Sequence, residues 1–212
     1  MFRLTPLVRN LIIINVVVFL AQNLSPIVDI GYCFDYSGIV RSDFVTSYLS
    51  LFNVGSNCFK PYQFFTYMFA HGGLGHIFFN MLALASFAPV LESHWGDKKF
   101  LIFYLATGIG AGVIYALVDL VLGTGNGGNM LGASGALYGI LMAFGLLFPN
   151  LELMLLFPPI PIKAKYMVFI MGFITYALDR SSSVAHVAHF GGALVGFIII
   201  SIWRSQGKDR GW

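Results

Sequence analysis

Hydrophobic positions in this chain run in long continuous blocks separated by short polar stretches. A helix needs about 20 apolar residues to cross the hydrocarbon core of a bilayer, and six blocks approach or reach that length. They cover residues 10–28, 73–91, 99–122, 132–148, 164–178 and 184–203. No internal repeat or linker interrupts them. The pattern predicts an all-α polytopic membrane protein, a bundle of six transmembrane helices, with residues 1–212 forming a single domain and no separate soluble domain.

The composition excludes a soluble globular domain. The chain is 58% hydrophobic and 10% charged, with a mean hydropathy of +0.80, whereas globular domains carry about 25% charged residues. The net charge of +3 and pI of 8.9 would suit an anionic partner. The cations lie at the ends of the blocks, however, so they indicate membrane topology and not nucleic-acid binding.

The distribution of cations predicts that both termini are cytoplasmic. With six spans and an inside N-terminus, Arg41, Lys60 and Arg180 lie outside. The other nine cations lie inside: Arg3, Arg9, Lys98, Lys99, Lys163, Lys165, Arg204, Lys208 and Arg210. This excess follows the positive-inside rule.

The first block has an alternative interpretation as a cleaved signal peptide, because Arg3 and Arg9 precede an apolar run over 11–21. Cleavage after Ala21 would need a small residue where Phe19 stands. A retained helix is therefore favoured.

The predicted topology places both cysteines, Cys33 and Cys58, in the outer loop over 29–62. Two cysteines in one extracytoplasmic loop can form a disulfide. Two free thiols are the alternative, since spacing alone does not decide the pairing.

Ser134 is the first candidate for chemistry. It follows a loop over 123–129 that is rich in Gly and Asn, and a helix is predicted to begin near Gly132. The free N–H groups of a first helical turn can stabilise an oxyanion. Tyr138 lies on the same helical face. Alternatively, Gly132, Gly135 and Gly139 form a helix-packing stripe, and Ser134 is an N-cap or makes an interhelical hydrogen bond.

His189 is the candidate base. Gly192 and Gly196 follow it at small-xxx-small spacing, which lets a neighbouring helix approach closely. Tight packing against the serine helix would bring Ser134 within hydrogen-bond reach of the imidazole. The alternative is a buried neutral histidine with one hydrogen bond.

A third group offers hydrogen-bond donors. His76 and Asn80, four residues apart, share one helical face and suit oxyanion stabilisation. We expect His71 to brace the preceding loop, and structural roles for His71 and His186. Asp119 either orients His189 or lies near the outer end of its helix, and we leave it outside the catalytic set.

Other chemistries fit the sequence poorly. There is no His-Glu-x-x-His motif, and no histidine pair has a nearby carboxylate, so we expect neither a metal nor a cofactor. A transporter or channel would be expected to show paired ionisable residues and broken helices in both halves.

Taken together, the motifs resemble the rhomboid family of intramembrane serine proteases in its compact six-helix prokaryotic form, from about Pro61 to Gly196. The matching positions are His71, His76 and Asn80; Gly132, Ser134, Gly135 and Tyr138; Ala188, His189, Gly192 and Gly196; and Glu92 with Gly96.

The resemblance implies a Ser134 nucleophile with His189 as base, without an acidic third member. It assigns oxyanion stabilisation to His76, Asn80 and the Ser134 N–H, and stacks Tyr138 on the His189 ring. It also implies single-span transmembrane substrates and a bacterial inner-membrane location, and it leaves the oligomeric state open; the cation positions indicate no nucleic-acid partner. A non-catalytic relative that binds membrane clients is the alternative within the family.

One departure from the family pattern lies in the first loop. Many rhomboids have Trp-Arg where this chain has Tyr62-Gln63. The change puts the conformation of the loop in question, and not the dyad.

Overall fold

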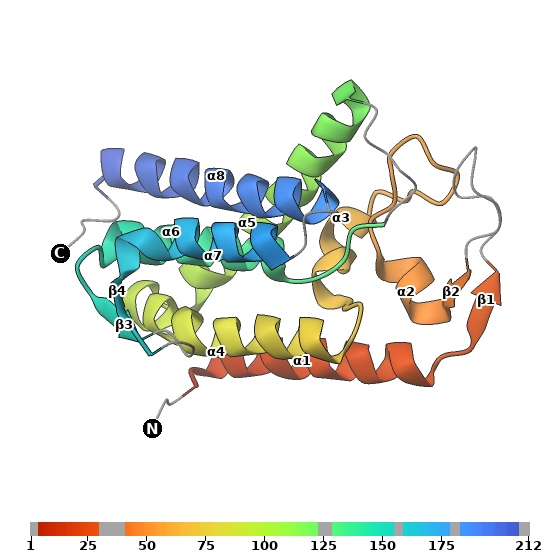
Figure 1. The fold of residues 1–212 in the computed structure, drawn as a ribbon, viewed down its shortest axis with the longest axis horizontal. Coiled ribbons are helices and arrows are strands. Elements are labelled where there is room, and N and C mark those ends of the chain that lie inside the picture. The colour runs from red at the N-terminus through yellow and green to blue at the C-terminus, as the bar shows by residue number, and fades with distance from the viewer. Residues whose placement is uncertain (1–3, 30–40, 123–128, 155–158, 179–182, 208–212) are drawn as a thin grey trace.

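The computed structural model describes residues 4–29, 41–122, 129–154, 159–178 and 183–207. Its long helices lie side by side in one bundle, with a two-stranded hairpin near each end (Figure 1). In chain order the elements are α1 (Pro6–Leu24), β1 (Ile27–Asp29), β2 (Arg41–Asp43), α2 (Phe44–Leu49), α3 (Gln63–Thr66), η1 (Tyr67–Phe69), α4 (Leu74–Trp95), α5 (Asp97–Leu122), α6 (Ser134–Leu147), β3 (Glu152–Met154), β4 (Pro161–Lys163), α7 (Ala164–Leu178) and α8 (Ser183–Ser205). Strands β1 and β2 pair antiparallel, with Val28 opposite Ser42, and β3 and β4 pair antiparallel, with Leu153 opposite Ile162.

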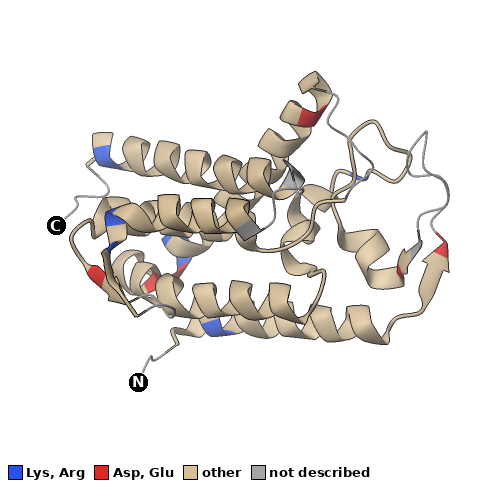
Figure 2. Ribbon diagram, in the orientation of Figure 1, with Lys and Arg blue, Asp and Glu red and all other residues tan. Residues whose placement is uncertain are grey.

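The predicted all-α polytopic membrane fold is confirmed. Helices α1, α4, α5 and α8 are long and apolar enough to cross a bilayer, whereas α6 and α7 are shorter apolar helices. The number of six spans stays a prediction. Figure 2 shows that most Lys and Arg positions lie at the end of the bundle where α1 begins and α8 ends.

Helix α1 differs from the prediction of 10–28 at both ends. It begins at Pro6, directly after the extended residue Thr5, because proline is well suited to the first helical turn. It ends at Leu24, and Ser25 is extended with ψ 148°. A residue before proline disfavours the helical conformation, and Pro26 follows. The predicted helix ran on to residue 28 because hydropathy alone does not mark this end, and Ile27–Asp29 instead form strand β1.

The N-terminus of α1 is fixed by a carboxylate from α4. Glu92, which is buried, accepts hydrogen bonds from the Thr5 hydroxyl (2.6 Å) and from the backbone N–H groups of Leu7 (3.2 Å) and Val8 (2.8 Å). A carboxylate is favoured at this positive end of a helix dipole. Gly96 ends α4 with φ 78°, a conformation that favours glycine. These contacts give a structural reason for the Glu92 and Gly96 pattern.

The loop before α4 contains helices α2 and α3, and Gln63 organises it. The Gln63 side chain is 1% exposed. Its Oε1 accepts from the N–H groups of Lys60 (3.0 Å) and Phe52 (3.4 Å), and its Nε2 donates to the Cys58 carbonyl (3.1 Å). The glutamine at the departure from the family pattern therefore binds the loop backbone. Cys58 is disulfide-bonded, and Cys33 lies outside the described residues, so the pairing stays a prediction.

Helix α6 lies in the middle of the bundle and packs against α4, α5, α7 and α8. Its 14 residues span about 21 Å at 1.5 Å per residue. The hydrocarbon core is about 30 Å thick. One end of α6 therefore lies inside the membrane when the other reaches the interface.

Candidate active site

Ser134 is the first residue of α6. Ala133 occupies the N-cap position and makes no side-chain capping bond. The first helical hydrogen bond runs from the Leu137 N–H to the Ala133 carbonyl (3.0 Å). The Ser134 N–H therefore has no acceptor within the helix and is directed out of the helix end. Ser134 is a first-turn residue, and the N-cap position, one of its two roles in the alternative interpretation, is occupied by Ala133.

Gly132 lies between this serine and the α4 donors. Its φ of +115° is strained for any residue with a side chain, and a Cβ there would lie 2.6 Å from His76 Nε2. Its N–H donates to the Tyr67 carbonyl (2.9 Å). A glycine is required at this position because α4 approaches the backbone so closely. The approach brings His76 and Asn80 to the segment that leads into Ser134.

His76 and Asn80 present donors toward this segment. The Gly72 N–H donates to His76 Nδ1 (3.3 Å), so the neutral ring carries its proton on Nε2, the atom nearest to Gly132. Asn80 is 6% exposed, and its Nδ2 makes no hydrogen bond with any described residue. A buried amide donor without a partner is costly and marks a place where an acceptor is expected to bind.

His71 lies before α4, and Gln22 of α1 holds its backbone. The Gln22 Oε1 accepts from the His71 N–H (3.0 Å), and the Gln22 Nε2 donates to the His71 carbonyl (3.2 Å). The His71 and His76 ring centroids are 5.1 Å apart. Burial and the nearby His76 ring lower the pKa of His71 to about 4. Its ring is therefore neutral near pH 7 and packs edge to face against the His76 ring.

Helices α6 and α8 meet backbone to backbone. A methyl group on Gly192 would overlap the Gly135 carbonyl oxygen, and one on Gly196 would lie 3.0 Å from the Gly139 Cα. Of the three glycines in the alternative packing stripe, Gly135 and Gly139 lie in this contact, whereas Gly132 precedes α6 and faces His76 of α4. The contact also brings the helix of His189 against the helix of Ser134.

The His189 ring is positioned by Tyr138. The two rings are stacked with centroids 4.2 Å apart and an interplanar angle of 12°. The Tyr138 hydroxyl lies 2.9 Å from Thr175 Oγ1 of α7. The Thr175 hydroxyl hydrogen is directed to the Met171 and Gly172 carbonyls, so Tyr138 is the donor of this bond. Through it, α7 fixes the plane on which the imidazole rests.

The described residues contain no hydrogen bond between the Ser134 hydroxyl and the His189 ring. In structures without substrate such bonds are often longer than in the reacting complex. His189 Nδ1 is buried and unpaired, so no described carboxylate orients this ring. Asp119 is buried within one turn of the end of α5, as one of the two alternatives expected.

A cavity of about 440 Å³ opens beside His189 between α6, α7 and α8. Its lining is mostly apolar and aromatic: Tyr138, Met142, Val168, Phe169, Gly172, Thr175, Tyr176, His186, His189, Phe190, Ala193, Leu194 and Phe197. It provides space for an apolar chain next to the candidate base. His186 contacts the Tyr176 ring here, with centroids 5.2 Å apart.

Two residues of the site were not singled out from the sequence. Thr175 holds Tyr138, and Tyr67 both accepts from Gly132 and donates its hydroxyl to the Gly108 carbonyl (2.6 Å). Neither has a spacing motif of its own. Within the described part of the chain, no three His, Cys, Asp or Glu side chains gather in a way that would hold a metal.

The residues of this site lie within a segment that matches a known protein family. A model of the family described as Rhomboid domain matches residues 59–206. Rhomboid protein 1, mitochondrial, of Saccharomyces cerevisiae is 30% identical over 163 residues, which are 76% of this chain and 43% of that protein. Presenilin-associated rhomboid-like protein, mitochondrial, of Homo sapiens is 31% identical over 154 residues, 65% of this chain and 38% of that protein.

A bacterial relative is matched over most of both chains. "Putative rhomboid protease YdcA" of Bacillus subtilis is 30% identical over 178 residues, 82% of this chain and 81% of that protein. The chain spans about two fifths of the length of the two mitochondrial relatives above.

Proposed function

The chain belongs to the rhomboid family, and on that premise we propose that it is an intramembrane serine endopeptidase with a Ser134–His189 dyad. The observation that carries the proposal is the unpaired, buried amide of Asn80, directed to the segment before Ser134. A serine peptidase needs such a donor for the oxyanion of its tetrahedral intermediate.

In the proposed mechanism, His189 takes the proton of the Ser134 hydroxyl as the oxygen attacks the scissile carbonyl carbon. The negative charge that develops on the carbonyl oxygen is stabilised by Asn80 Nδ2, His76 Nε2–H and the Ser134 N–H. The intermediate collapses to an acyl-enzyme, and His189 returns the proton to the leaving amine. Water then attacks the ester with His189 again as base. Tyr138 keeps the imidazole plane fixed throughout.

The proposed substrates are single-span transmembrane proteins in the lipid bilayer. The peptide groups of a membrane helix are hydrogen-bonded to one another, so the substrate helix must unwind locally before a carbonyl can reach Ser134. The short α6 supports a site below the membrane surface. The apolar cavity beside His189 supports entry of an unwound apolar segment past α7.

We also propose the orientation and location that follow from the cation distribution and the family. The end that carries Lys98, Lys99, Lys163, Lys165 and Arg204 faces the cytoplasm of a bacterium, and the site opens toward the outer half of the inner membrane. The observed gathering of described cations at one end supports this orientation.

A covalent serine probe tests the proposal directly. Incubation of the detergent-solubilised protein with a fluorophosphonate is expected to add one label, on the peptide that contains Ser134, because only an activated serine attacks this reagent. Mass spectrometry locates the label. A client-binding relative or a transporter would not be labelled, so an unlabelled, folded protein contradicts the proposal.

Asn80→Ala separates catalysis from stability. Turnover is expected to fall by roughly 10²-fold, the usual effect of removing one oxyanion donor. The thermal midpoint is expected to stay close to that of the parent, because Asn80 Nδ2 has no described partner to lose. Cleavage rate and thermal unfolding are measured on the same preparation. Asn23→Ala, which removes an exposed amide on α1, is the control, and unchanged turnover in Asn80→Ala would remove this residue from the site.

A further inference from the structure

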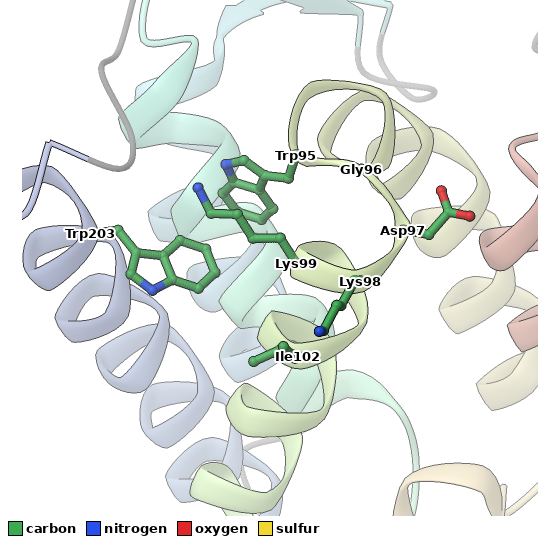
Figure 3. A pocket seen from close by; sticks show the side chains of 7 residues that line it. All are labelled: Trp95, Gly96, Asp97, Lys98, Lys99, Ile102 and Trp203. Carbon is green, nitrogen blue, oxygen red and sulfur yellow. The ribbon is translucent and has the colours of Figure 1, made fainter.

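The two ends of helix α4 are fixed in different ways. At its C-terminal end the Trp95 ring meets the Trp203 ring of α8 edge to face, with centroids 5.3 Å apart (Figure 3). At its N-terminal end Leu74 is 77% exposed. A Cβ added to Gly73 would find, among the described residues, no atom within 4 Å apart from its chain neighbours. Packing alone therefore does not fix the turn that presents His76, one of the proposed oxyanion donors.

One glutamine side chain holds the backbone just before this turn. Gln22 of α1 is 5% exposed. Its Oε1 accepts from the His71 N–H (3.0 Å), and its Nε2 donates to the His71 carbonyl (3.2 Å). The same Nε2 donates to the Thr46 hydroxyl oxygen (2.6 Å). The Gln22 amide therefore ties α1 to α2 and to the segment that leads into α4.

The restraint reaches His76 through a single peptide group. The His71 carbonyl and the Gly72 N–H belong to one planar peptide unit and point in opposite directions. On one side the carbonyl accepts from Gln22 Nε2 (3.2 Å), and on the other the N–H donates to His76 Nδ1 (3.3 Å). A rotation of this plane that breaks one bond also breaks the other. The Gln22 side chain therefore determines whether the Gly72 N–H meets the His76 ring.

Two glycines make this restraint necessary. Gly72 and Gly73 can adopt many backbone conformations at low cost, so the peptide plane between residues 71 and 72 has little preference of its own. While the Gly72 N–H occupies His76 Nδ1, the neutral ring carries its proton on Nε2, the atom that faces Gly132. Once the plane has rotated, the ring can take the other tautomer, in which Nε2 is an acceptor and cannot donate to an oxyanion.

We propose that Gln22 is a positioning residue for oxyanion stabilisation, which acts through the 71–72 peptide group on the place and the tautomer of the His76 ring. This inference rests on the proposed serine-protease function. Gln22 sets how well His76 donates and takes no part in the proton transfers. Its effect is therefore expected in kcat, which reports on interactions made only in the transition state, and little in KM.

A double-mutant cycle tests this role. Gln22→Met keeps the length of the side chain and removes its hydrogen-bonding groups. We expect kcat for a tagged single-span protein in detergent to fall roughly tenfold, a part of the loss of about 10²-fold that follows removal of an oxyanion donor. In a His76→Ala background the same change is expected to have no further effect on kcat, because the group that it positions is gone. An equal loss in both backgrounds would overturn the proposal, and so would an unchanged kcat in the single variant.

Gln63→Met is the matched control for lost stability. Gln63 is also a buried glutamine, and its amide binds three backbone groups of the loop before α4. Both changes leave buried backbone groups unpaired and are expected to lower the thermal midpoint. Rates are therefore taken below both midpoints and divided by the amount of protein that a fluorophosphonate labels. Gln63→Met is expected to keep kcat close to that of its background, both alone and combined with His76→Ala. If it couples to His76→Ala as strongly as Gln22→Met does, the effect is general loosening and the proposal fails.

NMR of protein labelled with ¹⁵N-histidine measures the tautomer without any cleavage. The His76 signal is identified by its absence in His76→Ala. We expect a neutral ring protonated on Nε2 in the parent and exchange between the two tautomers in Gln22→Met. Should Gln22→Met not fold, the parent decides, since protonation on Nε2 supports the proposal and protonation on Nδ1 overturns it. Failure of the protease function is a different result, namely cleavage that persists in Ser134→Ala.

Discussion

Ser134→Ala is expected to abolish cleavage of every single-span protein that the parent chain cuts. Removing the nucleophile of a serine hydrolase leaves only the effect of binding and of the oxyanion donors, and the loss in turnover reaches about 10⁶-fold in the best-studied case. We expect a loss of at least about 10⁴-fold, below detection in a cellular assay. Co-expression with a panel of tagged single-span proteins, followed by immunoblotting for fragments, measures it.

The fold is expected to survive this change. The N-cap position of α6 is Ala133 and not Ser134, so Ser134→Ala removes no N-cap, and a substitution without lost contacts usually stays within about 0.5 kcal/mol. Ser86→Ala is the matched control. It removes a hydroxyl from another membrane helix, α4, where Oγ bonds locally to the Leu82 carbonyl (2.7 Å), and it should leave cleavage intact. Persistent cleavage by a well-folded Ser134→Ala protein would show that another residue is the nucleophile.

The long membrane helices could be predicted because the hydropathy of a segment indicates directly whether it lies in the bilayer. A block such as 99–122 must be helical in lipid, since no water is present to satisfy its backbone, and α5 (Asp97–Leu122) agrees with it closely. The ends of α1 were predicted only to within about four residues, because they depend on single residues, Pro6 and Pro26, and a hydropathy window does not weigh these. Helices α2 and α3 are too short to appear in such a window.

The candidate site was predictable to the extent that it is local in sequence. Glycines at four-residue spacing predicted the close approach of α6 and α8, and a histidine and an asparagine at i and i+4 predicted a shared donor face. The supports of the site come from distant segments and carry no such spacing. The bond between Tyr138 and Thr175 spans 37 positions, and that between Gln22 and His71 spans 49. Only the three-dimensional packing brings these partners together.

Glu92 shows the same contrast between a pattern that is visible in the sequence and partners that only the fold brings near. Its place in the family pattern is visible in the sequence, but its partners lie 84 to 87 positions away at the start of α1. From the sequence alone, a carboxylate near the end of an apolar block would be interpreted as a charge at the membrane interface. Its burial is explained only by the free N–H groups of another helix, which need an acceptor.

Gly192→Ala is expected to have the largest effect on the fold of any single methyl group. The added Cβ would overlap the Gly135 carbonyl oxygen, and a backbone atom, unlike a flexible side chain, moves only if the whole helix moves. Overpacking costs about 1–3 kcal/mol and occasionally more, and we expect the upper part of this range. The thermal midpoint in detergent measures it.

Activity is expected to fall further than stability alone would require. Separating α6 from α8 moves His189 away from Ser134 and from its stacking partner Tyr138, and a displacement of about 1 Å at a reacting centre can reduce the rate by 10²-fold. Cleavage measured well below the thermal midpoint, where Gly192→Ala is still folded, should therefore already be low.

Two other glycines provide a graded control for this argument. At Gly196 an added Cβ would lie 3.0 Å from the Gly139 Cα, so Gly196→Ala should be destabilised less than Gly192→Ala. At Gly172 of α7 the nearest atom would be Tyr138 Cε1 at 4.0 Å, so Gly172→Ala should be neutral or gain up to about 1 kcal/mol from helix propensity. If all three variants unfold and cleave alike, close contact between α6 and α8 is not what holds the dyad. If Gly192→Ala is the worst on both measurements and Gly172→Ala keeps the thermal midpoint of the parent, the distance between α6 and α8 sets the activity.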